Sequence, residues 1–408
     1  MKRYRELLAF PHALSLILAA LPARIAYGMI ALSIFFKVQR ETNSIALAGL
    51  ALGLNSVAGS LTAGIRGSIL DRYGQRWPLR IFVPGYAVLI MALNITHDKS
   101  LLLIVAFLLG ISAPPINLSI RPLWKSVVPD DFLRVAYAVD TAVMNFAGVI
   151  GPVLATALAL SVHPGSALAT ASACMLIGGL SLGATSVSRN WIPEKKAKDH
   201  LPLWKHRPLQ LLMIEGCFIG FGWGLFDVGV PAFTTLENVP HRTAWILGAM
   251  GTANIVGGLV AGLVSKNIPA LVTMRRTYLF WLVATLPLAF TYPGWSMVIV
   301  GALSGLAGGA LQVFYWEVME AVRPKGSPTA MMGWLWTVEG TFMSLGAASG
   351  GFISEHISPR ACLATTSACI VIGFIILGFG KNLLSAANKI PTSAEDIAAM
   401  EENIKPAI

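Results

Sequence analysis

The sequence predicts an all-α membrane protein with twelve transmembrane helices in two pseudo-symmetric six-helix bundles. Three observations lead to this fold class. Only 12% of the 408 residues are charged and 55% are apolar, whereas about a quarter of a soluble chain is charged, so a soluble protein is excluded. Twelve apolar runs, separated by polar turns, approach the roughly 20 residues that a helix needs to cross a bilayer. The basic residues, finally, gather in alternate loops.

The twelve runs follow one another along the chain. The first six cover residues 14–38, 45–70, 79–95, 101–124, 135–160 and 167–187. The second six cover residues 209–233, 244–264, 277–292, 295–322, 329–353 and 361–379. The third and ninth are the shortest and have the least defined limits, because the ninth ends near Pro287 and a turn at 292–295.

The distribution of basic residues sets the predicted orientation. With the N-terminus inside, 24 of the 30 Lys and Arg residues fall in cytoplasmic segments, where Arg66 is counted with the loop after the second run, and Arg24 lies inside the first run. Only five fall in outer loops: Lys37, Arg40, Lys99, Arg242 and Arg360. Because Lys and Arg accumulate on the cytoplasmic side, both termini are expected there, and the net charge of +10 reflects orientation rather than nucleic-acid binding.

A secretory signal is the competing interpretation of the N-terminus, since Lys2 and Arg3 precede an apolar run. That run continues to Phe36 without polar interruption, and its removal would break the even number of spans. The four cysteines lie in apolar stretches: Cys174, Cys217, Cys362 and Cys369. They form no C-x-x-C pair and have no nearby histidine, so we expect neither disulfides nor a metal site.

A polar stretch at 188–208 divides the chain into two sets of six runs. We therefore expect an N-terminal six-helix bundle at 1–187, a cytoplasmic linker at 188–208, a C-terminal bundle at 209–380 and a cytoplasmic tail at 381–408. This organisation is typical of transporters whose substrate site lies between two related bundles near the bilayer midplane.

The loop between the second and third runs carries the most specific motif. Glycine, aspartate and arginine recur in the segment Gly67-Ser68-Ile69-Leu70-Asp71-Arg72-Tyr73-Gly74-Gln75-Arg76. The segment resembles the signature loop of the major facilitator superfamily. The resemblance implies the fold of that family, alternating access to a central site, and a latch in which the loop aspartate holds the start of the eleventh span while the cytoplasmic side is shut.

The same residues have a physical interpretation. Gly67 lets another helix approach closely, and Gly74 can adopt the left-handed conformation that turns the chain. Asp71 stands at a helix C-terminus, the unfavourable end for an anion, so a compensating partner is expected. Ser327-Pro328 resembles a helix start and is our choice of partner. In the alternative interpretation Asp71, Arg72 and Arg76 form only a solvated turn.

The second half departs from this pattern. Lys266 stands where the alignment of Gly262 with Gly67 would place an aspartate. We expect an asymmetric inner gate and, as a hypothesis, a contact of Lys266 with Asp130 or Asp131.

A weaker resemblance lies in the fifth run, where Gly148-Val149-Ile150-Gly151-Pro152 is similar to the glycine-proline motif of proton-coupled antiporters. The arginine usual in the fourth span of that branch is replaced by Phe107. Gly148, Gly151 and Pro152 therefore mark either an antiporter motif or helix packing with a bend.

Ionisable residues inside the spans are functional candidates, because each costs at least ~2.5–3.5 kcal/mol to insert. Arg24 and Glu339 lie near the middle of their runs and are the first choices. A carboxyl group in an apolar pocket can carry a proton, and Trp336 places an aromatic face beside Glu339. Both residues also allow a purely structural role.

For other polar and aromatic residues of the spans the sequence predicts a position, a partner or a place in the lining of a cavity. Asp227 and Glu215, expected near the outer and inner ends of the seventh run, are further candidates for the substrate or proton site, together with Tyr27. Glu317 and Glu320 are expected to face water or Arg323, and Arg121 to pair with Asp140. Further positions that could line a cavity are Tyr27, Asn55, Asn117, Asn145, Trp223, Asn254, Gln312 and Trp316.

These observations predict a secondary active transporter that moves a small organic solute or drug-like compound across the cytoplasmic (inner) membrane by proton-coupled efflux. Uptake or facilitated diffusion of a metabolite is one alternative, and a non-transporting receptor or scaffold with the same fold is another. The chain lacks G-x-S-x-G, H-E-x-x-H and phosphate-binding glycine motifs, so we expect no enzyme, catalytic residue, metal, cofactor or nucleotide. The expected partners are the substrate and the lipid bilayer, the expected energy source is the proton gradient, and the expected oligomeric state is a monomer.

Overall fold

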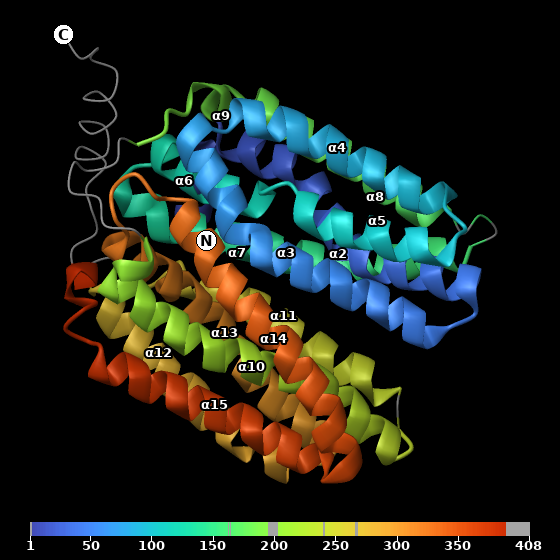
Figure 1. The fold of residues 1–408 in the computed structure, drawn as a ribbon. Coiled ribbons are helices and arrows are strands. Elements are labelled where there is room, and N and C mark those ends of the chain that lie inside the picture. Colours follow the sequence, from blue (N-terminus) through green and yellow to red (C-terminus); the bar gives the residue numbers. More distant parts are fainter. Residues whose placement is uncertain are drawn as a thin grey trace.

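The computed structural model describes residues 2–161, 163, 165–194, 203–239, 241–265 and 268–388, and these residues contain helices and no strand (Figure 1). The first half of the chain forms α1 (Lys2–Ala9), α2 (Ala13–Thr42), α3 (Ile45–Tyr73), α4 (Arg76–Ile95), α5 (Lys99–Ser112), α6 (Ile116–Val127), α7 (Asp130–Ala159), α8 (Ser166–Ala184) and α9 (Ser186–Asn190).

The second half begins with η1 (Leu203–Lys205) and ends with η3 (Ser385–Asn388). Between them lie α10 (Arg207–Leu236), α11 (Arg242–Ala261), α12 (Ala270–Thr285), η2 (Leu286–Phe290), α13 (Trp295–Val322), α14 (Ala330–His356) and α15 (Pro359–Phe379).

Ten spans among the described residues are long and apolar enough to cross a membrane. They correspond to α2, α3, α4, α5 with α6, α7, α8, α10, α11, α13 and α15. The helix α12 has only 16 residues, and α14, with its Trp, Thr and Glu residues, is also not among the ten. An all-helical membrane fold is therefore confirmed, whereas the count of twelve spans and the cytoplasmic termini stay predictions.

Two of the predicted runs differ from the observed helices. The fourth, expected to be continuous over 101–124, is broken between α5 and α6 at Ala113-Pro114-Pro115, because proline has no backbone N–H and disfavours a helical residue before it. The ninth begins earlier than expected, at Ala270, and its α-helix ends at Thr285, just before Pro287.

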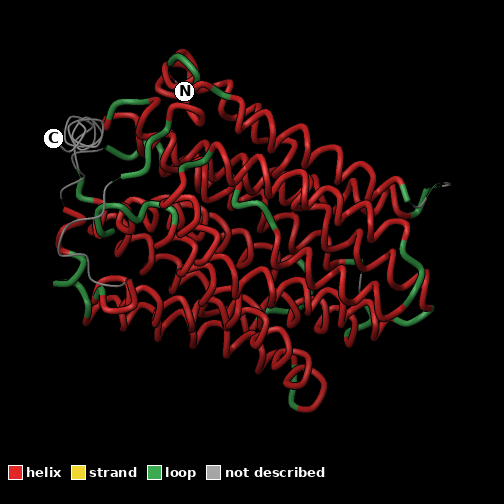
Figure 2. The backbone as a smooth tube through the Cα atoms, turned by 45° about the horizontal axis from the view of Figure 1, so that its top comes forward, coloured by secondary structure: helices red, strands yellow, loops and turns green. Residues whose placement is uncertain are grey.

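The helices form two bundles that lie side by side, one above the other in Figure 1. In the first, α2 packs against α7 and α8; in the second, α10 packs against α14 and α15, and α11 against α13. The bundles meet along two helix pairs, α3 with α14 and α7 with α11. The long helices keep a common direction in the rotated view (Figure 2).

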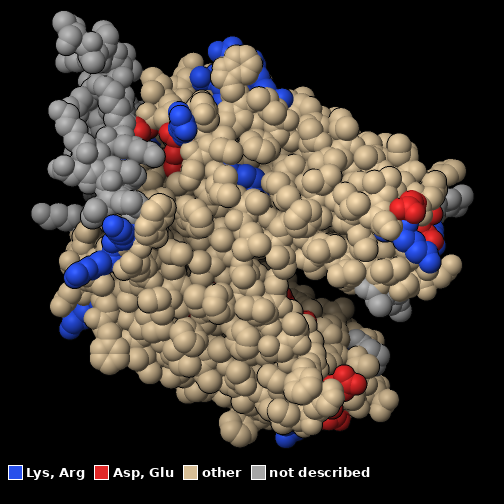
Figure 3. All heavy atoms as spheres, in the orientation of Figure 1, with Lys and Arg blue, Asp and Glu red and all other residues tan. Residues whose placement is uncertain are grey.

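The surface in Figure 3 has an uncharged belt, with Lys, Arg, Asp and Glu concentrated toward the two ends of the molecule. At one end a hollow separates the bundles. At the other end, called the gate end here, the bundles are in contact through the α3–α4 loop, α6, the start of α7 and the α13–α14 loop. The molecule is thus open at one end and shut at the other.

Candidate functional site

A cavity of about 850 Å3 lies between the two bundles. Its walls come from α2, α3, α4, α5 and α7 on one side and from α10 to α14 on the other. Most of the positions proposed for such a lining are present: Tyr27, Asn55, Asn145, Trp223, Asn254, Gln312, Trp316 and Trp336. Asn117 is not among them, because its side chain accepts a hydrogen bond from Arg24 outside the cavity. The volume is in the range of pockets that bind drug-sized molecules.

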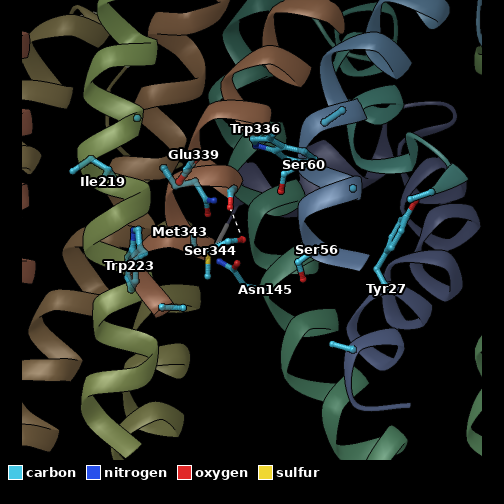
Figure 4. A pocket seen from close by; sticks show the side chains of 18 of the residues that line it. Tyr27, Ser56, Ser60, Asn145, Ile219, Trp223, Trp336, Glu339, Met343 and Ser344 are labelled. Atoms are coloured by element: carbon cyan, nitrogen blue, oxygen red, sulfur yellow. Dashed lines mark hydrogen bonds between the residues drawn. The ribbon is translucent and has the colours of Figure 1, made fainter. Parts of the chain in front are cut away.

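Glu339 lies on the cavity wall formed by α14 (Figure 4). Two glycine contacts bring that wall close to its neighbours: a Cβ on Gly220 would collide with the backbone carbonyl of Glu339, and a Cβ on Gly340 would collide with Ser60. The Glu339 carboxyl has no hydrogen bond or ion pair with any described residue. It is therefore an acceptor available to a ligand.

Glu215 lies on the same side of the cavity, on α10. Its Oε1 accepts a hydrogen bond of 3.0 Å from Tyr278 and its Oε2 accepts one of 3.2 Å from Tyr315. A Cβ on Gly373 would lie 3.5 Å from Cγ of Glu215 and would collide with the Tyr278 hydroxyl, so the glycine makes room for the pair. Glu215 was a candidate for the substrate or proton site and was expected near the inner end of its helix; the structure places it on the cavity wall that carries Glu339.

Asp227 does not line the cavity. It lies on α10 one turn beyond Trp223, toward the open end, and its side chain is exposed. The aromatic wall instead includes Trp223 stacked on Trp281, with ring centroids 6.0 Å apart, and Trp336 edge-on to Trp316 at 6.2 Å.

Arg24 is buried away from the cavity, among α2, α6 and α7. Its Nη2 lies 2.6 Å from Oδ1 of Asp140, and its Nε donates to Asn117 at 3.1 Å. Asp140 also faces Arg121, with 3.5 Å between Nε and Oδ2, which confirms the predicted Arg121–Asp140 pair. Arg24 and Glu339 thus do not share a site, and the geometry favours a structural role for Arg24.

Arg66 is a cavity residue that sequence reasoning missed, because it was counted as part of the loop after the second run. It is buried in α3 and donates to the carbonyls of Gly59, Thr62 and Ala113. Tyr27 donates to the carbonyl of Pro114. The two side chains satisfy carbonyl groups that the α5–α6 break leaves without helical partners.

Asp71 contacts the start of α14 at the gate end. Its carboxylate accepts hydrogen bonds from the backbone amides of Thr329, at 3.1 and 3.2 Å, and Ala330, at 2.7 Å, and from the Thr329 hydroxyl. The helix begins at Ala330, not at the expected Ser327-Pro328, and Thr329 gives it no side-chain cap of its own. The unfavourable position of Asp71 at the end of α3 is compensated by the N-terminus of α14.

The residues around Asp71 fall into two groups, those that allow the contact with α14 and those that are exposed at the surface. A Cβ on Gly67 would lie 2.5 Å from the Thr329 carbonyl oxygen, so the close helix approach expected there is present. Gly74 has a φ of 75° and a ψ of −176°, a conformation that is essentially restricted to glycine. Arg72 and Arg76 are exposed and lie beside Tyr73 and Trp77, so they take no part in the contact with α14.

The family model of the Major Facilitator Superfamily matches residues 16–347. The chain belongs to this superfamily. The match covers the cavity, the Asp71 loop and most of α14.

Relatives within the superfamily are distant in sequence. An uncharacterized MFS-type transporter of Sinorhizobium fredii is 25% identical over 416 residues, which cover 97% of this chain and 98% of the relative. The multidrug efflux pump Tap of Mycobacterium bovis is 24% identical over 280 residues, which cover 63% of this chain and 66% of that protein.

Solved structures share the superfamily fold. A bacterial homologue of the iron transporter ferroportin in an outward-facing state has a TM-score of 0.78 at 12% identity, covering 91% of this chain and all of that one. The human organic anion transporter MFSD10 (TETRAN) has a TM-score of 0.69 at 14% identity, covering 92% of this chain and 99% of that one. At these identities the likeness concerns the fold alone.

Three further sets of ion pairs join the two halves of this superfamily member at the gate end. Arg134 on α7 binds the Glu317 carboxylate at 2.7 and 2.9 Å and donates to the carbonyl of Ser265. Glu317 was expected to face water or Arg323; it is buried and paired with Arg134 instead. Nζ of Lys125 lies 2.6 Å from Glu320, which also binds Arg323 as expected.

The third set involves the segment after α9. Glu194 accepts two hydrogen bonds of 2.6 Å from Arg323 and one of 2.9 Å from the Gly326 amide. Burial raises the pKa of Glu194, but the hydrogen bonds and charge of Arg323 outweigh burial and hold the pKa below its ordinary value. The expected contact of Lys266 with Asp130 or Asp131 cannot be placed, because Lys266 lies outside the described residues.

The glycine-proline motif of α7 packs through one glycine only. A Cβ on Gly151 would lie 2.5 Å from Cα of Gly28, and Pro152 lies beside Gly28, whereas a Cβ on Gly148 would meet nothing within 4 Å. The packing expected at Gly148 is therefore absent, since that residue points away from α2. Gly151 and Pro152 mark the crossing of α2 and α7.

Proposed function

We propose that this protein is a secondary active transporter of the cytoplasmic membrane that exports a small organic solute in exchange for protons by alternating access. The observation that carries the proposal is the cavity between the halves, with the unpaired Glu339 on its wall and one end shut by contacts between the bundles. An alternating-access transporter needs a central site of this kind and a seam that can separate.

The direction of opening follows from charge. Because Lys and Arg accumulate on the cytoplasmic side of membrane proteins, the gate end, with its basic loops, is assigned to the cytoplasm. The hollow then faces the outside, so the structure corresponds to an outward-facing state. Asp71, Arg134 and Glu194 are the residues whose inter-bundle contacts hold the cytoplasmic side shut.

Glu339 is proposed as the proton carrier. A carboxyl group with no partner in a low-dielectric cavity can exist with or without its proton at moderate cost. One proton that moves down 100 mV supplies ~2.3 kcal/mol, enough for a roughly fifty-fold solute gradient. The similarity to the efflux pump Tap supports export rather than uptake.

The experiment uses inside-out membrane vesicles that contain the full chain, with a cationic, an anionic and a neutral fluorescent compound. The proposal predicts that at least one compound accumulates in the vesicles only while their interior is more acidic than the medium. Addition of a protonophore should abolish this accumulation. Equilibration that ignores the gradient would show facilitated diffusion instead. The absence of any protein-dependent movement would support a non-transporting scaffold.

A further inference from the structure

We propose that the substrate is an organic cation with an apolar, aromatic body, and that Glu339 binds its positive charge. The inference rests on the proposed transport function, because it assigns a substrate class to the same cavity. Its basis is that two of the charged side chains in the cavity lining have hydrogen-bond partners within the protein, whereas the third, Glu339, has none among the described residues.

The cavity lining contains three charged side chains: Arg66, Glu215 and Glu339. The Arg66 guanidinium is directed at backbone carbonyls of its own half. Each carboxyl oxygen of Glu215 already accepts a hydrogen bond from a tyrosine. Glu339 alone offers unpaired acceptors, so loss of its proton gives the cavity a negative charge that a bound cation can balance.

The surroundings of Glu339 fit a cation that carries aromatic groups. Trp336 lies one helical turn before it, and Trp223 lies on the neighbouring helix α10, both with side chains toward the cavity (Figure 4). The face of an indole ring attracts a cation within about 6 Å of the ring centroid. The chain already uses this chemistry beside the cavity, where the Arg121 guanidinium lies 3.6 Å from the ring centroid of Trp316.

A metal cation fits the cavity poorly. Divalent metals in proteins take at least three or four side-chain ligands or a larger set of oxygens. The lining contains no histidine or cysteine, and no group of three or more His, Cys, Asp or Glu side chains lies close enough for a metal in the described part of the chain. The volume of about 850 Å3 is also far larger than an ion requires.

Binding of two isosteric ions of opposite charge, tetraphenylphosphonium and tetraphenylborate, tests the proposal on the purified full chain. Equilibrium dialysis measures affinity, and a pH indicator in weak buffer measures proton release. At a pH at which Glu339 is protonated in the free protein, the wild type is expected to prefer the phosphonium ion at least tenfold and to release close to one proton per ion bound. Glu339→Gln should weaken phosphonium binding about tenfold or more and abolish proton release, because the acceptor charge is gone.

Four further variants serve as controls for this test. Glu339→Asp retains the charge and should retain preference for the cation, which separates loss of charge from misfolding. Asp227→Asn removes an acid on α10 that does not line the cavity and should bind like the wild type. Trp336→Ala should weaken binding while Trp336→Phe, which keeps an aromatic face, should retain most of it.

Equal affinity for the borate ion, or unchanged phosphonium binding in Glu339→Gln, would overturn the cation assignment. So would displacement of the phosphonium ion by micromolar Mn2+ or Fe2+, which would indicate a metal site. Failure of the transport proposal has a different signature: phosphonium would bind through Glu339, yet no compound would move with the pH gradient.

Discussion

The Asp71 carboxylate lies 2.7 Å from the backbone amide nitrogen of Ala330, so a side chain at the end of α3 caps the beginning of α14 in the other half of the molecule. The contact satisfies amide groups that the helix cannot satisfy itself. It exists only while the gate end is closed, because α3 and α14 belong to different bundles.

Asp71→Ala is therefore expected to favour the state in which the gate end is open. Loss of a charged helix cap costs about 1–2 kcal/mol, which shifts the ratio of the two states by about 5- to 30-fold. In inside-out vesicles, labelling of Ser327→Cys, buried at this end, by a membrane-impermeant maleimide would measure the shift. Equal labelling with and without Asp71→Ala would show that Asp71 forms only a local turn.

The close approach of α3 and α14 gives a second prediction. Gly67→Ala places a methyl group 2.5 Å from the Thr329 carbonyl oxygen, whereas Gly53→Ala on the same helix meets nothing within 4 Å. Gly67→Ala should increase maleimide labelling of Ser327→Cys, because the two helices must separate. Gly53→Ala should leave labelling unchanged, and a similar increase in both variants would rule out the steric explanation.

The buried charges of the first bundle predict an asymmetry between two variants. Asp140→Asn leaves Arg24 and Arg121 without a carboxylate, while Arg24→Gln leaves Asp140 beside Arg121. Removal of one partner of a buried pair costs about 3–5 kcal/mol, so Asp140→Asn should lower the melting temperature more than Arg24→Gln. If folded Arg24→Gln lost pH-driven transport, Arg24 would have a functional role rather than a structural one.

The contact of Glu194 with Arg323 predicts a defined pH dependence. The pKa of Glu194 is lower in the folded protein than its ordinary value of 4.5. Its contribution to stability is therefore complete above that value and is lost as the pH falls through the lowered pKa. The melting temperature of wild type should exceed that of Glu194→Gln by a constant margin from pH 5 to 8 and converge with it in stronger acid. A margin that disappeared between pH 6 and 8 would contradict the assignment.

Much of this arrangement could be predicted from the sequence because it depends on local composition. Runs of apolar residues locate the helices, and the pattern of Gly67, Asp71 and Gly74 points to a tight loop with an anion that needs a partner. The exact start of α14 could not be predicted, because its cap comes from Asp71, which lies more than 250 residues earlier in the chain.

The membership of the cavity wall was less predictable. Arg24 and Glu339 both lie near the middle of apolar runs, and depth alone cannot show that Arg24 faces Asp140 while Glu339 faces the cavity. Glu215 was a sequence candidate, but its hydrogen bonds could not be predicted, because Tyr278 and Tyr315 come from α12 and α13. Arg66 was misplaced because a charge near the end of a run resembles a loop residue until its carbonyl partners are known.

Substrate-dependent proton movement in reconstituted vesicles tests the central claim that Glu339 couples transport to protons. We expect a pH change on addition of a transported compound for the wild type and for Asp227→Asn, and none for correctly folded Glu339→Gln. Transport driven by the pH gradient that persists in Glu339→Gln at the rate of the wild type would contradict the claim.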